Sequence, residues 1–418
     1  MKKIIFIAFY YNHSNEIASK RLQGIAKYLP DFGFEPIVIV PKTSNETVLI
    51  DNVRVVETDY EDMVSRFLPT SKGNSPNNEA PSQSQSNPLI AKGISVAGEV
   101  FAYPDGMKYW HKPAFDKCCE IIENEEISGI ISSSFPITCH TIARDLKEKY
   151  DIPWIADLRD LWNLNPYVNH TFIRNHFEKK LELKTFENVD VLTTTTPLAR
   201  ETLQSLHPQK RIEAVVSGYD PQDFTNIKQS ETSDKLRLMY AGSLYGGKRD
   251  PSILFDALHQ LIDEEKIEQD KIAIDFYGDT ENLERLSEKY GLSPIVNIHG
   301  RIAHEEVLQK QMNSDVLLLI SWMNESEKMF IPGKVYEYMA CKKPILSIGY
   351  HEGSLKDLIE KTEIGHHVSD VENCKKAIYD YYSKYNNNEL KYCGNEFADE
   401  YSVKETAKKF AQILEEIQ

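Results

Sequence analysis

The sequence of 418 residues lacks the features that mark several classes of protein. Its six cysteines form no C-x-x-C pair, so neither a zinc site nor a disulfide framework is indicated. No apolar run reaches the roughly 18–20 residues that a bilayer-spanning helix needs. Lysine and arginine total 48 against 64 aspartates and glutamates, and the net charge of −16 argues against a chain-wide nucleic-acid binder. We therefore expect a cytoplasmic protein, kept reduced, with no nucleic-acid partner.

The sequence does contain an alternation of strands and helices. Residues 4–11 are apolar but too few for a signal peptide, and no small-residue cleavage site follows, so we expect a buried strand. Helical periodicity over 17–29 and a second strand over 35–41 complete a βαβ unit. This order predicts a Rossmann-like α/β domain.

The alternation starts again near residue 230, which predicts a second α/β domain. The predicted domains span residues 1–228 and 229–400, with a ligand cleft beyond the carboxyl ends of their strands. Residues 71–88 differ, because 15 of these 18 are Ser, Pro, Asn, Gln or Gly, and we expect a mobile loop there. Further strands are expected over 129–133, 153–158, 189–194, 236–241, 272–277, 296–299, 316–320 and 344–347.

Glycines and cations indicate one phosphate site. The first domain lacks the G-x-G-x-x-G fingerprint, which argues against a dehydrogenase. The second domain opens with GSLYGGKRDP at 242–251, a glycine loop ahead of a helix, where anions bind readily. It matches a Walker A loop except that Arg249 replaces the Ser or Thr that would bind Mg²⁺. We expect Lys248 and Arg249 to bind phosphate without a metal; the alternative is a solvated turn with two surface charges.

A second cluster follows at residues 329–340, MFIPGKVYEYMA. Pro-Gly before an amphipathic helix exposes N–H groups at the helix start, where phosphate binds. Lys334 and Glu337 share one face of this helix, so they can bind phosphate and ribose hydroxyls. The alternative is a plain ion pair on a solvated helix.

Together these segments resemble family 4 glycosyltransferases. The resemblance rests on YAGSLYGGKRDP at 240–251, GR at 300–301 and IPGKVYEYMACKKPIL at 331–346. SSSFP at 132–136 and PWIADLRDLWNLNP at 153–166 are similar to bacterial members that build surface polysaccharides. The resemblance implies the GT-B fold, two facing Rossmann-like domains with a cleft between them. It also implies that the last helix, within 401–418, returns to the first domain.

The resemblance implies roles for individual residues. The donor-binding positions are Asn15, Gly246, Gly247, Arg249, Gly278, Asp279, Arg301, Gly333, Lys334 and Val335. Lys248, Asp160 and Glu337 are the candidate catalytic residues, and Asp157, Arg159 and His140 are candidates on the acceptor side.

Some of these positions have other readings. Asp157, Arg159 and Asp160 can instead form a structural ion-pair network, and a lone histidine such as His140 is more often structural. Family members often carry two glutamates eight residues apart, with Glu337 as the second. Met329 stands at the first position here, and Glu325 or Glu327 are the candidates to compensate.

We therefore expect a retaining glycosyltransferase that uses a nucleotide-diphosphate sugar, needs no metal or other cofactor, and acts in polysaccharide assembly. One alternative of the same fold is a nucleotide-sugar 2-epimerase, and another is a non-catalytic nucleotide-binding partner subunit. A phosphate-binding NTPase is disfavoured, because Arg249 occupies the position of the magnesium ligand.

Residues 169–184 predict a basic amphipathic helix in an acidic protein. Such a helix can lie on an anionic membrane, on its cytoplasmic face, to reach a lipid-linked acceptor. The alternative is an ordinary surface helix that packs its apolar stripe. Residues 103–110, after the predicted mobile loop, are candidates to shape the acceptor site.

Overall fold

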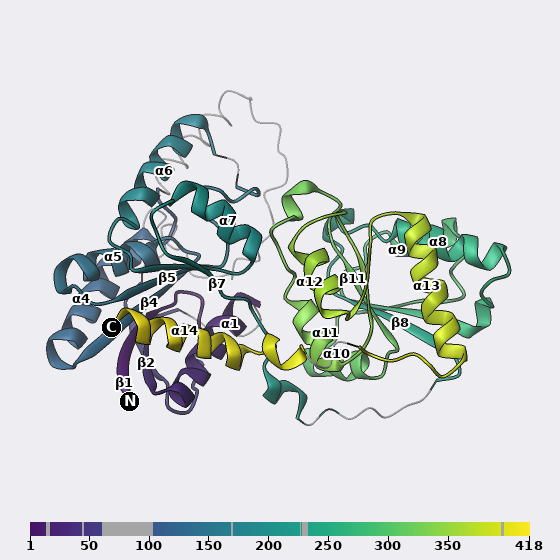
Figure 1. The fold of residues 1–418 in the computed structure, drawn as a ribbon, viewed down its shortest axis with the longest axis horizontal. Helices are drawn as coiled ribbons and strands as arrows, with labels where there is room; N and C mark the ends of the chain where they lie inside the picture. Colours follow the sequence, from purple (N-terminus) through teal and green to yellow (C-terminus); the bar gives the residue numbers. More distant parts are fainter. Residues whose placement is uncertain are drawn as a thin grey trace, which may run out of the picture. The chain divides into compact units, whose positions relative to one another are not determined.

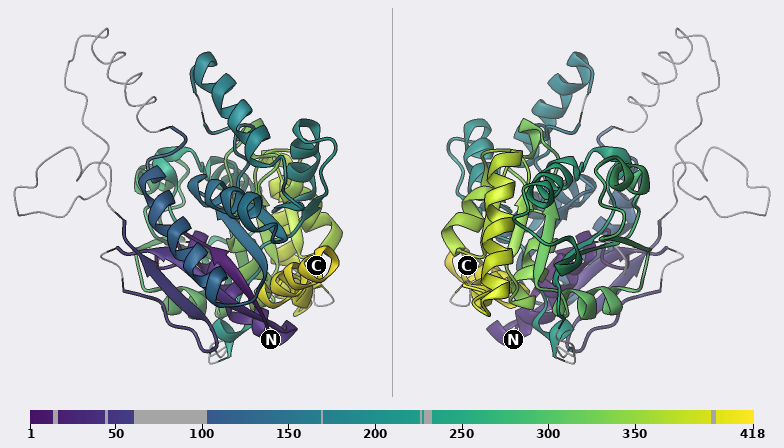
Figure 2. Two further views of the ribbon diagram at one scale, coloured as in Figure 1. Left: turned by 90° about the vertical axis from the view of Figure 1, so that its left-hand side faces the viewer. Right: turned by 90° about the vertical axis from the view of Figure 1, so that its right-hand side faces the viewer.

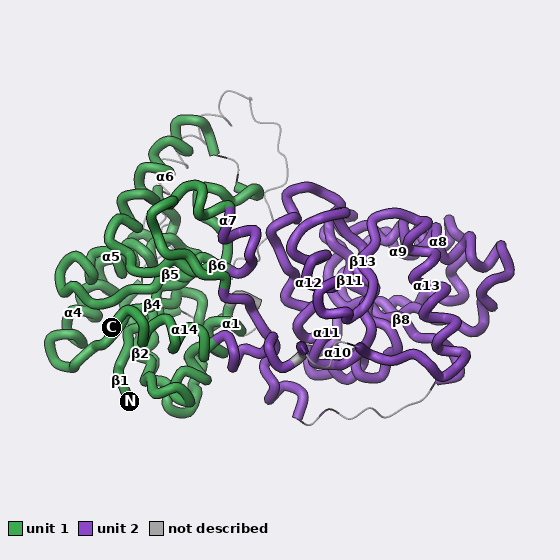
Figure 3. The backbone as a smooth tube through the Cα atoms, viewed as in Figure 1, with its two compact units in different colours: residues 1–194, 202–214, 407–418 green, residues 195–201, 215–406 purple. Residues whose placement is uncertain are grey.

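The computed structural model describes residues 1–13, 17–43, 46–60, 103–168, 170–225, 227, 233–393 and 397–418. The chain forms two compact units (Figure 3). Unit 1 holds residues 1–194, 202–214 and 407–418, and unit 2 holds residues 195–201 and 215–406. Asn15 and the loop predicted at 71–88 lie outside the described residues. The predicted domain limits at 228 and 401 remain a prediction.

Unit 1 is built on a seven-stranded parallel sheet in the order β3-β2-β1-β4-β5-β6-β7 (Figure 1). Its strands are β1 (Lys2–Ile7), β2 (Phe34–Pro41), β3 (Arg54–Thr58), β4 (Ile127–Ser134), β5 (Trp154–Leu158), β6 (Val191–Thr194) and β7 (Ile212–Ala214). The helices are α1 (Ile17–Tyr28), α4 (His111–Asn124), α5 (Thr138–Tyr150) and α6 (Phe172–Thr185). Two more, α7 (Pro197–Leu206) and α14 (Val403–Ile417), begin in unit 2 and continue into unit 1 from residues 202 and 407. The order reverses between β1 and β4, which is where doubly wound sheets bind ligands.

The C-terminal residues pack on the sheet of unit 1. In α14, the side chains of Ala407, Phe410 and Leu414 are buried, as the amphipathic pattern predicts. Gly129 in β4 makes room for this helix, because a Cβ there would lie 2.8 Å from a Leu414 methyl carbon. Arg21 of α1 lies 5.8 Å from the Phe410 ring. Residues 407–418 are therefore part of the core of unit 1.

Unit 2 has a six-stranded parallel sheet in the order β10-β9-β8-β11-β12-β13. Its strands are β8 (Leu236–Ala241), β9 (Ile272–Tyr277), β10 (Val296–Gly300), β11 (Val316–Ile320), β12 (Ile345–Ile348) and β13 (Gly365–Val368). Helices α8 (Ser252–Asp263), α9 (Leu283–Lys289) and α13 (Val371–Asn386) pack against one face, with Phe255 and Ile274 in the shared core. Helices α10 (His304–Met312), α11 (Lys334–Cys341) and α12 (Ser354–Thr362) pack on the other face.

The two parallel sheets confirm the predicted α/β fold class. The predicted strands recur within a few residues, although β1 ends at Ile7 and residues 8–11 form a buried turn. Three strands were not predicted from the sequence: β3, β7 and β13. They have three to five residues each and only one buried residue each, so their sequences lack the apolar run or alternation that indicates a strand.

Candidate functional site

In unit 2 the loops that follow β8, β9 and β10 interlock at the carboxyl edge of the sheet. The N–H of Gly242 donates to the Tyr277 carbonyl at 2.7 Å, and the N–H of Gly278 donates to the Gly300 carbonyl at 2.7 Å. Gly278 has a φ of +115°, and a Cβ there would lie 2.4 Å from the Gly242 carbonyl oxygen. Only glycine fits this close approach, which holds the three loops together.

The loop after β8 presents cationic side chains. The N–H groups of Gly247 and Arg249 both donate to the Leu244 carbonyl at 3.1 Å, so the loop uses these donors internally. Lys248 Nζ lies 5.1 Å from the Trp322 ring, and the Arg249 guanidinium lies 4.5 Å from the Tyr245 ring. The loop therefore offers charged groups held against aromatic rings, which suits an anionic ligand.

The start of α11 brings a third cation to this edge. Lys334 Nζ lies over Gly242, 1.8 Å from where a Cβ would be, and 5.1 Å from the Tyr240 ring. The pKa of Lys334 is lowered to about 8, mainly by burial and also by the Arg249 charge, while the Glu337 charge acts in the opposite direction. An anion bound here would relieve both the burial of this ammonium group and its repulsion by Arg249.

Two acidic residues complete the rim of this edge. Glu337 lies one turn along α11 from Lys334, and its Oε1 is 3.7 Å from His304 Nε2 at the start of α10. Asp279, after β9, pairs with Arg301, after β10, through an Nε–Oδ1 distance of 2.7 Å. This pair is largely exposed. The edge thus combines three cations with a carboxylate and a paired arginine.

The chain is similar to glycosyltransferases in a family comparison and in solved structures. Residues 235–384 match the family described as "Glycosyl transferases group 1". Sucrose-phosphate synthase from Thermosynechococcus elongatus superposes with a TM-score of 0.65 at 14% identity, over 100% of this chain and 99% of that chain. A glycosyltransferase from Rickettsia africae superposes with a TM-score of 0.62 at 13% identity, over 100% of this chain and 98% of that chain.

HepE from Anabaena, solved in complex with UDP, gives a TM-score of 0.59 at 13% identity and covers 100% of both chains. The chain has the GT-B fold. The residues that match the family model lie within its second unit. Among curated proteins, no sequence matches the chain significantly.

In this GT-B chain, most predicted donor-binding residues lie at one edge of unit 2. Gly246 and Gly247 have positive φ values of 62° and 88°, and a Cβ at either position would meet nothing within 4 Å. Gly333 directly precedes α11, whereas the Val335 side chain is fully buried and its N–H donates to the Pro332 carbonyl at 3.1 Å. Val335 therefore supports the first turn of the helix.

The position of the first family glutamate is occupied by Met329, whose carbonyl accepts a hydrogen bond from Thr196 Oγ1 at 2.7 Å. Glu325 is exposed and pairs with Lys328 at 3.0 Å. Lys328 also pairs with Glu352 at 2.6 Å. Glu325 is therefore engaged in a surface ion-pair network.

In unit 1, Asp157 is a fully buried centre of hydrogen bonds at the end of β5. It pairs with Arg21 at 3.0 Å and accepts from Ser133 Oγ and Thr193 Oγ1, both at 2.9 Å. Burial by itself would raise the pKa of Asp157, but the Arg21 guanidinium and these hydroxyls hold it below its usual range. The ion-pair partner is thus Arg21 of α1, which sequence reasoning missed.

Arg159 and Asp160 follow directly. Arg159 Nε donates to the Ser134 carbonyl at 2.6 Å and thereby supports the turn between β4 and α5. Burial raises the pKa of Asp160, which is half-buried, and the Arg159 charge lowers it. A carboxyl group with a raised pKa at a strand end is a candidate for proton transfer.

His140 lies inside the core of unit 1. Its Nδ1 is 2.7 Å from Ser132 Oγ, and its ring meets Phe186 edge-on at 5.3 Å. Burial lowers the pKa of His140 to about 3, so the ring is neutral. These contacts favour the structural role over the acceptor-side role.

Several buried polar atoms near the carboxyl edge of this sheet were not predicted as site residues. Tyr11 Oη, Ser134 Oγ and Thr194 Oγ1 have no hydrogen-bond partner among the described residues. Buried polar groups normally have one, so these atoms are available to a ligand or water. The hydroxyl-rich runs SSSFP and TTTTP, each ending a strand before proline, were the available sequence signal.

Two kinds of feature are absent from the described residues. No group of three or more His, Cys, Asp or Glu side chains there is arranged to hold a metal ion. Among the described helices, none has both the length and the apolar content needed to span a bilayer.

Proposed function

We propose that the chain is a retaining, family 4-like glycosyltransferase. It would transfer a sugar from a nucleoside diphosphate sugar to a glycan or a lipid-linked acceptor during cell-surface polysaccharide assembly. The observation that carries the proposal is the group of three cations at one edge of unit 2. Lys334 lies over Gly242 and the Tyr240 ring, and Lys248 and Arg249 lie on the loop after β8. Support also comes from HepE, which was solved with UDP and with UDP-glucose.

The chemistry needs stabilisation of a departing diphosphate. Preorganised cations lower the energy of the charge that develops on the leaving phosphate. In the proposed reaction Lys248, Arg249 and Lys334 bind that phosphate, and Glu337 binds the ribose. The bond between the sugar and the phosphate breaks as the acceptor oxygen attacks from the same face, and the leaving phosphate takes the acceptor proton.

The test is incubation of the purified chain with a panel of nucleoside diphosphate sugars in EDTA. We expect release of one nucleoside diphosphate, and NMR of the first product should give the anomeric configuration of the donor. Lys248→Ala should reduce the rate at least tenfold, and the matched surface variant Lys361→Ala should not. An inverted product would overturn the proposal of retention, and Mg²⁺-dependent turnover would overturn metal independence.

The His304–Glu337 pair favours the 2-epimerase as a second candidate, because this reaction needs acid and base groups beside the sugar. The same incubation distinguishes the two functions. An epimerase would convert the donor into its C2 epimer without an acceptor, whereas a transferase would leave that centre unchanged.

We further propose that α6 contacts an anionic membrane on the cytoplasmic side. The helix extends beyond its neighbours in unit 1 (Figure 2), and the side chains of Glu178 and Glu182 are on its buried face. Phe172, Ile173 and Phe177 are 88%, 70% and 55% exposed. This polarity is the reverse of that in an ordinary surface helix, which supports the membrane contact over a helix that packs its apolar stripe.

Charge complementarity identifies the membrane as the partner. Lys179, Lys180 and Lys184 are exposed beside the apolar side chains, so the outward face offers apolar groups for the lipid and cations for anionic headgroups. The Trp162 indole donates to Glu178 at 2.7 Å, and His207 pairs with Glu182 at 3.2 Å. These buried contacts hold the orientation of the helix.

Liposome sedimentation tests this contact. We expect binding to vesicles with anionic phospholipids, loss of binding in Phe172→Ser/Phe177→Ser, and no change in the control Tyr379→Ser, at an exposed residue of α13. Equal binding of the double variant and the wild type would contradict the proposal.

A further inference from the structure

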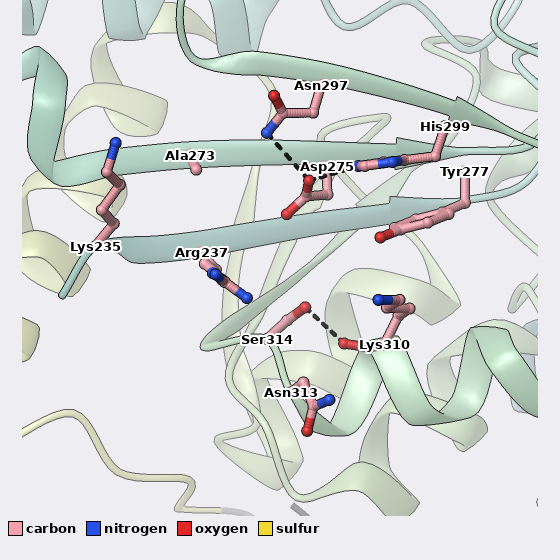
Figure 4. Close-up of a pocket in the computed structure, with 10 residues that line it drawn as sticks. All are labelled: Lys235, Arg237, Ala273, Asp275, Tyr277, Asn297, His299, Lys310, Asn313 and Ser314. Atoms are coloured by element: carbon pink, nitrogen blue, oxygen red, sulfur yellow. Dashed lines mark hydrogen bonds and ion pairs between the residues drawn. The ribbon is translucent and has the colours of Figure 1, made fainter. Parts of the chain in front are cut away.

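A second pocket lies on the face of the unit 2 sheet and has a volume of about 380 Å³ (Figure 4). It is lined by residues of β8, β9 and β10, by Lys235 ahead of β8, and by the C-terminal part of α10 with the two residues after it. None of its lining residues belongs to the loop 242–250 or to the start of α11. The three cations of the pocket are therefore not those of the proposed phosphate site, although Tyr277 and His299 directly precede Gly278 and Gly300 of the donor loops.

The pocket exists because one face of β9 and β10 is polar. In β9, Ile274 and Phe276 point into one core cluster, whereas Asp275 and Tyr277 alternate onto the opposite face. Tyr277 is buried in the core cluster on that face, whereas Asn297 and His299 of β10 are exposed there. The polar side chains of Asp275, Asn297 and His299 thus leave this end of the face uncovered by apolar packing.

The floor of the pocket is an ordered network. Asp275 Oδ1 lies 2.7 Å from His299 Nε2 and accepts a hydrogen bond from Asn297 Nδ2 at 3.1 Å. The His299 ring is stacked on Tyr277, with centroids 4.4 Å apart and planes 10° apart. The carboxylate is thus engaged with its neighbours, and the two rings form a flat wall.

Three cations line the pocket against this one carboxylate: Lys235, Arg237 and Lys310. Among the described residues, no ion pair engages the ammonium groups of Lys235 and Lys310. The backbone around Arg237 is fixed, because its N–H donates to Asp315 Oδ2 at 2.8 Å and its carbonyl accepts from the Asp315 N–H at 3.0 Å. Positive charge is concentrated here in a chain whose net charge is −16.

We propose that this pocket binds a phosphorylated small molecule of monosaccharide size. Arg237 and Lys310, which lie on the same side of the pocket, bind the phosphate, whereas Lys235 lies at the opposite end (Figure 4). The His299 ring, stacked on Tyr277, packs against the sugar ring, and Asn297 faces its hydroxyl groups. The volume is near the lower end of the roughly 300–1,000 Å³ typical of ligand pockets, which fits a sugar phosphate better than a nucleotide sugar. This second site does not depend on the proposed transfer reaction.

Calorimetric titration of the full chain with glucose 6-phosphate, inorganic phosphate and glucose tests the proposal. We expect glucose 6-phosphate to bind most tightly and glucose at least tenfold more weakly. Lys235→Glu/Lys310→Glu should weaken glucose 6-phosphate at least tenfold, while Lys361→Glu should not. Lys310→Ala alone, on the exposed side of α10, provides a milder variant if the double variant is unstable.

Lys334→Ala separates this pocket from the donor site, because it should leave glucose 6-phosphate binding unchanged. Two results would overturn the proposal. The first is the absence of binding by either phosphate probe. The second is binding that Lys334→Ala abolishes and Lys235→Glu/Lys310→Glu does not change, which would assign the sugar phosphate to the donor loops.

Discussion

At the scale of single residues, Lys334 is the position where the structure adds most to what the sequence predicts. The motif IPGK predicts a cation at a helix start, but not that its half-buried side chain places the ammonium group over Gly242. That placement depends on β8 and α11, which are about 100 residues apart in the chain. Asp157 is a similar case, because its partner Arg21 comes from a distant helix.

The lowered pKa of Lys334 predicts a pH dependence of nucleotide binding. The pKa is about 8, so the ammonium group loses its charge as the pH rises through 8. Affinity for a nucleoside diphosphate should therefore be greatest below pH 8 and fall by up to about tenfold per pH unit above it. Titration calorimetry from pH 7 to 9.5 would measure this.

Lys334→Arg provides the matched control, since a guanidinium group stays charged over this range. Its affinity should change little with pH. A wild-type affinity that is constant from pH 7 to 9.5 would show that the charge of Lys334 does not contribute to binding.

At the scale of elements, long buried strands and amphipathic helices were predictable, and short edge strands were not. β1 and β11 have unbroken apolar runs, because helices cover both faces of the sheet. β13 consists of Gly365, His366, His367 and Val368, and only Val368 is buried. Its place in the sheet comes from pairing with β12, which composition does not reveal.

The contact between α14 and β4 predicts a specific stability effect. Gly129→Ala adds a Cβ 2.8 Å from Leu414, so it should lower the free energy of unfolding by about 1–3 kcal/mol. Gly106→Ala is the matched control, because a Cβ there would meet nothing within 4 Å. Urea unfolding would compare the variants.

A double-mutant cycle sharpens this prediction. Leu414→Ala removes the methyl groups that the new Cβ approaches, so the two substitutions together should cost less than their sum by about 1 kcal/mol. Additive effects would mean that α14 does not pack on β4 as described.

At the scale of the whole molecule, the fold and the chemistry have different origins in the sequence. The α/β alternation was sufficient to predict two Rossmann-like units. The same architecture recurs in the sucrose-phosphate synthase, which is only 14% identical to this chain. The site residues come from short loops at the ends of strands, so no periodicity predicts how they meet. The resemblance of a few motifs identified the candidates in unit 2, whereas the pairing of Glu337 with His304 required the folded sheet.

The net negative charge of the molecule bears on how the three cations in unit 2 can bind a diphosphate. A chain with a charge of −16 repels anions at long range, so three cations at one edge of unit 2 must act locally to bind a diphosphate. We propose that such binding needs no metal, because the side chains supply the positive charge.

The most direct test of the central claim is calorimetric titration of the full chain with UDP, GDP and ADP in EDTA. We predict that one of these diphosphates binds without a metal and that Lys334→Ala or Lys248→Ala weakens it at least tenfold, while Lys361→Ala has no effect. Binding that appears only with Mg²⁺, or that both site variants leave unchanged, would contradict the account.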